Sequence, residues 1–185
     1  IYVDVIEEMT GITGEALVAC MEELCREGFF RVNTEDRSAL SYIFKHDIER
    51  EIVVERLGPA GRRHLHLRAA KALEKRRRKQ PVFIHGIAHH YEAAGETQPA
   101  VKAWLEAGRY ARSQYSKEET YTAYGRALEW ISGLPAGYDE TLIYDVVSEW
   151  GNFAHDLDDP RACEQIYQCC LDAGEATQSL LLIGT

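Results

Sequence analysis

The feature that most constrains the fold is a spacing of small and aromatic residues that occurs twice in the second half of the chain. Around Gly95 the spacing places small or aromatic residues at Ala88, Tyr91, Ala100, Trp104 and Ala107. Around Asp158 the same offsets give Gly151, Ala154, Cys163, Tyr167 and Cys170. Small residues let two helices approach closely, and an aromatic side chain fills the space beside them. The spacing therefore predicts closely packed pairs of helices.

A looser third copy of the pattern places Thr120, Tyr124 and Ala127 before a stop at Gly133-Leu134-Pro135. These offsets are those of tetratricopeptide repeats, which this region resembles. One such helix pair cannot bury its apolar face alone, so neighbouring pairs have to stack. The resemblance implies a tetratricopeptide-like α-solenoid over residues 81–185, with an irregular helical bundle as the alternative.

The first 57 residues have a different pattern, in which two short helices precede a hairpin. A helix over residues 1–9 is followed by the turn Thr10-Gly11-Ile12, and Thr13 suits the N-cap of a second helix that runs to Glu27 and stops at Gly28. The apolar stripe of this second helix consists of Leu17, Cys20, Met21, Leu24 and Cys25. Its pattern predicts one buried face.

Two apolar runs, 29–32 and 40–44, flank the polar segment TEDRS and predict a two-stranded hairpin. A helix then begins near Asp47, and its apolar positions are Ile48, Ile52 and Val53 or Leu57. We therefore expect a mostly α-helical protein, in which a partial winged helix with a short β-hairpin (residues 1–57) precedes the solenoid. The chain opens on Ile1 and closes on LLLIGT, and we interpret both domains as cut from a longer protein.

A basic segment joins the two regions. Residues 56–79 hold ten Lys or Arg and one Glu, while the net charge of the whole chain is −9. We expect a basic linker helix over residues 58–80 with Leu65, Ala69, Ala72 and Leu73 inward. Its cations would either form a solvated face or bind a partner. That partner would be an acidic protein, the core of the same protein or, less favourably, nucleic acid. The residues that could bind it are Arg62, Arg63, Arg68, Lys71, Arg76, Arg77 and Arg78.

The sequence contains no complete catalytic motif. The glycine-rich phosphate-binding motifs and the GxSxG elbow are absent, so we expect no enzymatic activity and no cofactor in this chain. His85 and His89 have the spacing of metal ligands on one helical face, but the intervening Glu of HExxH and a third ligand are missing. We expect these histidines, and His90 beside them, to pack or to face solvent.

The cysteines and the hydropathy indicate the compartment. The five cysteines, an odd number, lack the paired spacing of a zinc site and predict mostly buried free thiols in a reducing environment; they are Cys20, Cys25, Cys163, Cys169 and Cys170. No apolar run reaches the roughly 18 residues that a membrane span needs. We therefore expect a cytoplasmic protein that does not contact a membrane.

Four segments together resemble a known family; they are ALVACMEELCREGFF, SYIFKHDIEREIVVERL, GRRHLHLRAAKALE and IAHHYEAAGETQPAVKAWLEAGRYA. Their order is similar to that in bacterial STAND signal-transduction ATPases, including transcriptional activators of the LuxR and SARP types and proteins with cyclase domains. The resemblance implies a winged helix and a sensor arm that follow a P-loop ATPase core absent from this chain. It further implies ATP and ADP as ligands of that core, and a protein or small-molecule effector on the arm.

The resemblance also implies a role for His46 and Asp47. Related nucleotide switches carry a Met-His-Asp motif at a strand-to-helix junction, where the histidine approaches the β-phosphate of ADP. Here the motif reads Lys45-His46-Asp47, so that Met is not matched. A histidine at a helix start can donate to an anion, and Asp47 could cap the helix or orient the ring. The alternative is that both residues serve only the local structure.

Two other functions remain open. A helix-turn-helix with a wing could bind DNA, but the second helix carries four Glu against Arg26 alone, the wrong sign for phosphate. A repeat scaffold could bind proteins without any nucleotide. Its groove could use aromatic residues, although most of them should instead pack between helices; they are Tyr110, Tyr115, Tyr121, Tyr124, Trp130 and Trp150.

Overall fold

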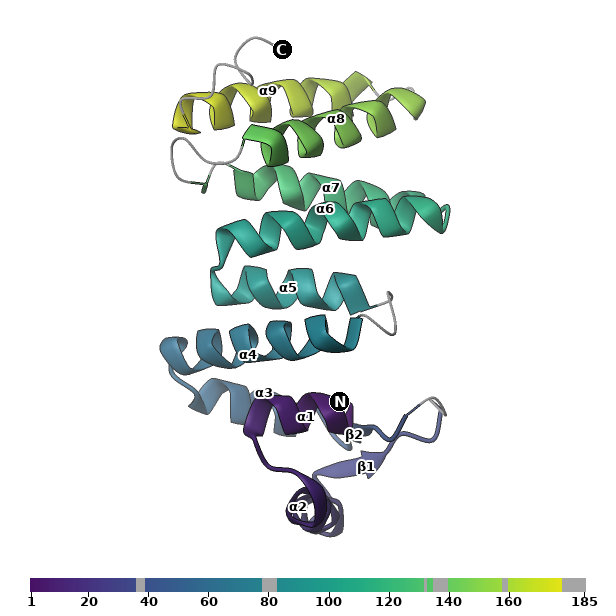
Figure 1. Ribbon diagram of the computed structural model, residues 1–185, viewed down its shortest axis with the longest axis vertical. Coiled ribbons are helices and arrows are strands. Elements are labelled where there is room, and N and C mark those ends of the chain that lie inside the picture. The colour runs from purple at the N-terminus through teal and green to yellow at the C-terminus, as the bar shows by residue number, and fades with distance from the viewer. Residues whose placement is uncertain (36–38, 78–82, 132, 135–139, 158–159, 178–185) are drawn as a thin grey trace. The chain divides into compact units, whose positions relative to one another are not determined.

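The protein is described by a computed structural model that covers residues 1–35, 39–77, 83–131, 133–134, 140–157 and 160–177 (Figure 1). The described residues are mostly helical and contain one two-stranded sheet, as expected from the sequence. The chain divides into two compact units, Ile1–Gln80 and Pro81–Thr185. Each is presented separately below.

The first unit begins with an extended segment and two helices. Helix α1 (Val3–Thr10) ends at Gly11, whose φ of 73° places it in the left-handed region, and α2 (Gly14–Arg26) follows Thr13 as its N-cap. Gly28 has a φ of 88° and lies just beyond α2, as predicted. The helix expected over residues 1–9 starts only at Val3, because Ile1 and Tyr2 are extended. The amide of Tyr42 donates to the carbonyl of Ile1 at 2.7 Å.

The predicted hairpin is confirmed. Strands β1 (Phe30–Val32) and β2 (Tyr42–Phe44) pair antiparallel, with Phe30 opposite Phe44, and the centroids of these two rings lie 4.3 Å apart. Tyr2 adds an isolated bridge to Ser41 next to β2. The core beneath the hairpin consists of Leu17, Met21 and Tyr42, packed by Val3, Ile6, Leu24, Cys25 and Phe30. Cys20 was expected in this stripe but is exposed, because it lies on the solvent side of α2.

Helices α3 (Asp47–Arg56) and α4 (Pro59–Arg77) complete the first unit. The helix expected from Asp47 onward is present, but its apolar positions are not covered: Ile48, Ile52 and Val53 are 60%, 45% and 53% exposed. In α4, Ala69 and Ala72 are buried as expected, but Leu65 is exposed and Ala70 takes a buried position. The face that α4 buries is therefore centred on alanines and not on its leucines.

The second unit is a series of helices that run back and forth (Figure 1). They are α5 (Ile84–Ala94), α6 (Thr97–Ser113), α7 (Lys117–Ile131), α8 (Glu140–Asp156) and α9 (Pro160–Thr177). Each helix packs on its sequence neighbours, and contacts between α6 and α8 and between α7 and α9 tie alternate helices together. Every predicted packing residue of the copy around Gly95 is buried. Gly95 itself has a φ of 77° at the end of α5.

The other two copies of the pattern differ from the expectation. Thr120, Tyr124 and Ala127 are fully buried in α7. They pack against α6, so α6 serves as the second helix of the copy around Gly95 and also as the neighbour that covers α7. In the copy around Asp158, a residue outside the described part, Ala154 and Cys170 are buried, but Cys163 and Tyr167 are exposed. The reason is that α9 packs on α8 and α7, and no described element covers its other side. The expectation of mostly buried thiols thus holds for Cys170, whereas Cys25 is half-buried and Cys20 and Cys163 are exposed; the side chain of Cys169 lies outside the described part.

Candidate functional site

The junction between β2 and α3 places His46 and Asp47 at the start of a helix. His46 is the N-cap residue, with φ −133° and ψ 130°, and its side chain makes no capping hydrogen bond. The expectation that Asp47 caps the helix is wrong, because Asp47 is already its first helical residue. Both side chains are exposed. An incoming anion can therefore reach the imidazole directly.

The electrostatics of this junction are mixed. The N-terminus of α3 contributes partial positive charge, and Lys45 adds a cation one residue earlier. Asp47 and Glu49 in the first turn of α3 oppose both. The imidazole of His46 can donate one hydrogen bond to a phosphate oxygen, but the junction alone does not form a phosphate cradle. Contact between His46 and ADP thus stays a prediction that requires a second domain.

The basic helix α4 divides its cations between solvent and the fold. Arg62, Arg63 and Lys71 are exposed and Arg68 is half-buried. Arg76 forms an ion pair with Asp4 of α1, and its guanidinium lies 3.7 Å above the centre of the Tyr2 ring. Arg77 is half-buried, and Arg78 lies outside the described residues.

The role of Arg76 inside the fold was missed in the sequence. Lys75 also pairs with α1, through Glu8. Asp4 and Glu8 could have indicated an ion pair with another element, since the first helix carries carboxylates and has no cations of its own nearby. What the sequence did not show is that α4 packs on α1. The surface of exposed cations on α4 is consequently smaller than expected.

The histidines of α5 contact an aromatic ring. His85 and His89 both lie edge-on to Trp104, with ring centroids 6.2 Å and 4.7 Å away. Burial lowers the pKa of His85, which favours the neutral ring. Among the described residues no group of three or more His, Cys, Asp or Glu side chains is arranged to hold a metal ion.

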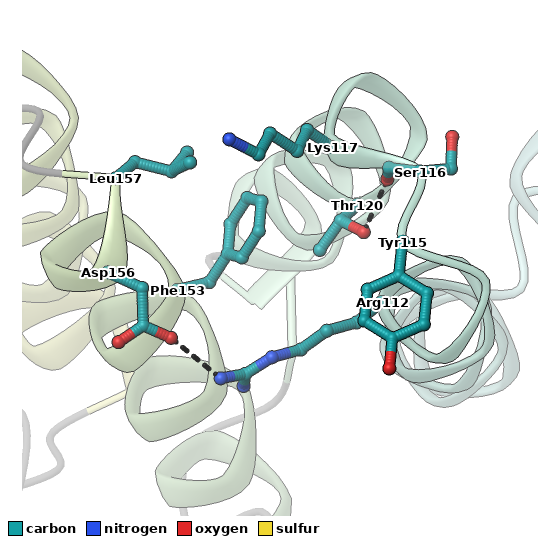
Figure 2. A pocket seen from close by; sticks show the side chains of 8 residues that line it. All are labelled: Arg112, Tyr115, Ser116, Lys117, Thr120, Phe153, Asp156 and Leu157. Atoms are coloured by element: carbon teal, nitrogen blue, oxygen red, sulfur yellow. Dashed lines mark hydrogen bonds and ion pairs between the residues drawn. The ribbon is translucent and has the colours of Figure 1, made fainter.

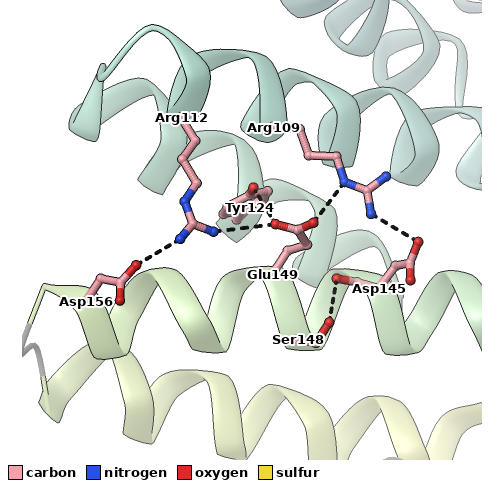
Figure 3. Close-up of polar contacts among 7 residues, drawn as sticks. All are labelled: Arg109, Arg112, Tyr124, Asp145, Ser148, Glu149 and Asp156. Atoms are coloured by element: carbon pink, nitrogen blue, oxygen red, sulfur yellow. Dashed lines mark hydrogen bonds and ion pairs between the residues drawn. The ribbon is translucent and has the colours of Figure 1, made fainter.

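A polar network joins α6, α7 and α8 (Figure 3). Glu149 of α8 accepts hydrogen bonds from Arg109 and from the hydroxyl of Tyr124, both at 3.1 Å. Arg109 also donates to Asp145, and Arg112 donates to Asp156 at 2.8 Å. Burial, followed by the charge of Glu149, raises the pKa of Tyr124 to about 12. The ion pairs link α6 to α8, and the hydrogen bond from Tyr124 connects α7 to the same carboxylate of Glu149.

A hollow lies at the end of this network, beside the turn from α6 to α7 (Figure 2). Its volume is about 190 Å³. The residues around it are Arg112, Tyr115, Ser116, Lys117, Thr120, Phe153, Asp156 and Leu157. Of the aromatic residues considered for a groove, Tyr124 and Trp150 are buried between helices, whereas Tyr115 is 92% exposed at this hollow. Sequence reasoning did not find the site because three of its residues, Phe153, Asp156 and Leu157, come from α8 and the position directly after it.

Comparisons with family models, with curated proteins and with solved structures find no match. Of the helices in the described ranges, none combines the length and apolar character needed to cross a membrane.

Proposed function

We propose that this chain is the regulatory and sensor-arm region of a multidomain nucleotide-switch ATPase of the STAND type. Residues 1–57 would form its winged helix and the second unit a tetratricopeptide-like arm. The order of extended segment, helix, turn, helix, hairpin and helix in the first unit supports the winged helix. The stacked helices with small residues at their contacts support the arm.

The observation that carries the proposal is the uncovered helix α3. It buries none of its side chains and exposes Ile48, Ile52 and Val53 directly beside His46. Burying one such side chain contributes about 1.5–3 kcal/mol, so this face gains most when another surface covers it. An ATPase core docked on α3 would bring its nucleotide next to the exposed His46.

In this mechanism the arm binds a protein or small-molecule effector, and the first unit passes the signal on. His46 holds the ADP state of the core, and binding of the effector shifts the population toward the ATP state. The output domain would regulate transcription or synthesise a cyclic nucleotide in the cytoplasm. Direct binding of DNA by α2 is disfavoured, because Glu15, Glu22 and Glu23 are exposed on this helix and Glu27 is exposed at its C-cap.

The test uses a protein in which a P-loop core precedes this chain. We expect His46→Ala and the double variant Ile48→Ser/Ile52→Ser to release ADP faster than the unchanged protein. The matched control is Val18→Ser on α2, a side chain that is 50% exposed. In the 185-residue chain alone, all three variants should change stability by no more than about 0.5 kcal/mol.

Unchanged retention of ADP in both test variants would overturn the nucleotide switch. Should the sequence upstream of Ile1 lack a Walker A motif, the scaffold that binds proteins without nucleotide becomes the better description.

A further inference from the structure

The hollow beside the α6–α7 turn combines an apolar floor with a charged rim. Phe153 is 6% exposed and lies at the centre of the hollow, between Lys117 and Leu157 on one side and Tyr115 and Arg112 on the other (Figure 2). Thr120 is fully buried, and its hydroxyl is satisfied by the carbonyl of Ser116 at 2.7 Å. The floor therefore offers a ligand apolar contact and no unpaired polar group.

The size of the hollow limits what it can hold. Its volume of about 190 Å³ is small for a drug-sized ligand. An apolar cavity of about 150 Å³ accommodates a benzene molecule. The hollow therefore fits a single aromatic ring with a short polar substituent.

Tyr115 is held at the rim by an unfavourable backbone conformation. Its φ of 58° is in the left-handed region, and it is the one non-glycine residue with positive φ in the described part of the chain. The turn is fixed by hydrogen bonds from Tyr115 to Arg112 and from Ser116 to Ala111, both at 3.0 Å. Glycine is the usual residue at such a helix end. A tyrosine here adds strain, and its ring, 92% exposed, gains no packing within the fold.

The charges at the rim favour an anion. Arg112 is held by Asp156 at 2.8 Å and by Glu149 at 3.6 Å. Lys117 makes no ion pair within the described residues and stands at the first position of α7, where the helix dipole adds positive charge. Glu118 and Glu119 in the same turn oppose this charge but do not line the hollow. Lys117 is thus the cation available to a ligand.

We propose that this hollow binds a small aromatic carboxylate, with its ring on Phe153 beside Tyr115 and its carboxylate at Lys117. The ligand would cover the exposed ring of Tyr115 and so gain a contact that the fold alone lacks. This inference rests on the proposed function in one respect: it takes the ligand to be the effector of the arm. Binding to the chain requires no nucleotide, so the two proposals can fail separately.

The experiment titrates the 185-residue chain with phenylacetate and follows backbone amide shifts by NMR. We expect saturable shifts confined to the α6–α7 turn and the end of α8. Phenylacetamide has a similar shape but no charge. It should bind about five- to tenfold more weakly, because one exposed charge-assisted hydrogen bond is lost.

Three variants locate the site. Lys117→Gln should reduce the affinity for phenylacetate to that for phenylacetamide, while Lys102→Gln, which removes an exposed lysine of α6 away from the hollow, should leave it unchanged. Tyr115→Gly should weaken binding several-fold but raise the thermal midpoint, because the strain is removed.

Three results would overturn the proposal. The first two are an absence of saturable shifts at this turn, and equal affinities of the Lys117→Gln and Lys102→Gln variants for phenylacetate. If Tyr115→Gly binds as tightly as the unchanged chain, the ring of Tyr115 does not belong to the site and the assignment is wrong.

Discussion

At the scale of single residues, the closest packing in the second unit depends on Gly108. A Cβ atom placed on Gly108 would lie 2.3 Å from two ring carbons of Tyr124. The ring cannot move aside easily, because it is fully buried and its hydroxyl is bonded to Glu149. The contact of α6 with α7 therefore requires a residue without a side chain at position 108.

We expect Gly108→Ala to lower the free energy of unfolding by about 1–3 kcal/mol through overpacking. The control is Gly125→Ala in α7, where an added Cβ meets nothing within 4 Å; this change should stabilise by about 0.5–1 kcal/mol, because alanine favours the helix. Urea unfolding followed by tryptophan fluorescence measures both, since Trp104, Trp130 and Trp150 all lie in this unit. Equal effects of the two substitutions would contradict the packing argument.

Tyr124 also makes stability depend on alkaline pH. Its pKa is raised from 10.0 to about 12 in the folded protein by burial and by Glu149. Between these two values the unfolded state has lost the phenolic proton and the folded state has not. The folded state is therefore disfavoured progressively as the pH rises from 10 to 12.

Two pKa units correspond to about 2.7 kcal/mol, and we expect the unchanged chain to lose up to this amount of stability across the window. The Tyr124→Phe variant should lose correspondingly less stability over the same pH range, because phenylalanine at position 124 does not titrate. The measurement compares urea unfolding of both proteins at several pH values from 9 upward, so that contributions from other groups cancel. Parallel profiles for the two proteins would exclude the proposed titration.

At the scale of elements, the contact of α1 with α4 includes two ion pairs that differ in burial. The side chain of Arg76 is 8% exposed, whereas that of Lys75 is 67% exposed, although both pair with carboxylates of α1. The two cations should consequently contribute very different amounts to stability.

We expect Arg76→Ala to destabilise the first unit by about 1–3 kcal/mol, because both the ion pair with Asp4 and the contact with the Tyr2 ring are lost. Lys75→Ala should cost no more than about 0.5 kcal/mol, as is usual for exposed pairs. Amide hydrogen exchange in α1 reports both changes within the intact chain. Faster exchange after Lys75→Ala than after Arg76→Ala would show that burial is not what matters here.

The elements also show which predictions from sequence are reliable. The turn at Gly11, the end of α2 near Gly28 and the pairing of β1 with β2 were predicted because each depends on residues close in sequence. The apolar spacing of Ile48, Ile52 and Val53 correctly predicted a helix, yet these side chains are largely exposed. A helical apolar pattern shows that a face is suited to contact, but not whether anything in the chain covers it.

At the scale of the whole molecule, charge separates the two units. Residues 1–80 hold 15 Lys or Arg and 14 Asp or Glu, a net charge of +1, whereas residues 81–185 hold 6 and 16, a net charge of −10. The acidic character of the chain thus belongs to the helical stack. Lys117 is one of six Lys or Arg residues in that stack, so an anion bound beside it depends on this local positive charge and is opposed by the net charge of the unit.

The helices, the hairpin and the residues through which α5, α6 and α7 pack could be predicted from the sequence, because they depend on local periodicity and on the sizes of residues a few positions apart. Which cations face solvent and where a hollow forms depend on how distant helices pack together. Arg76 meets Asp4 across 72 positions, and the hollow joins Tyr115 to Phe153 across three helices. Such contacts depend on how helices pack, which no local pattern contains.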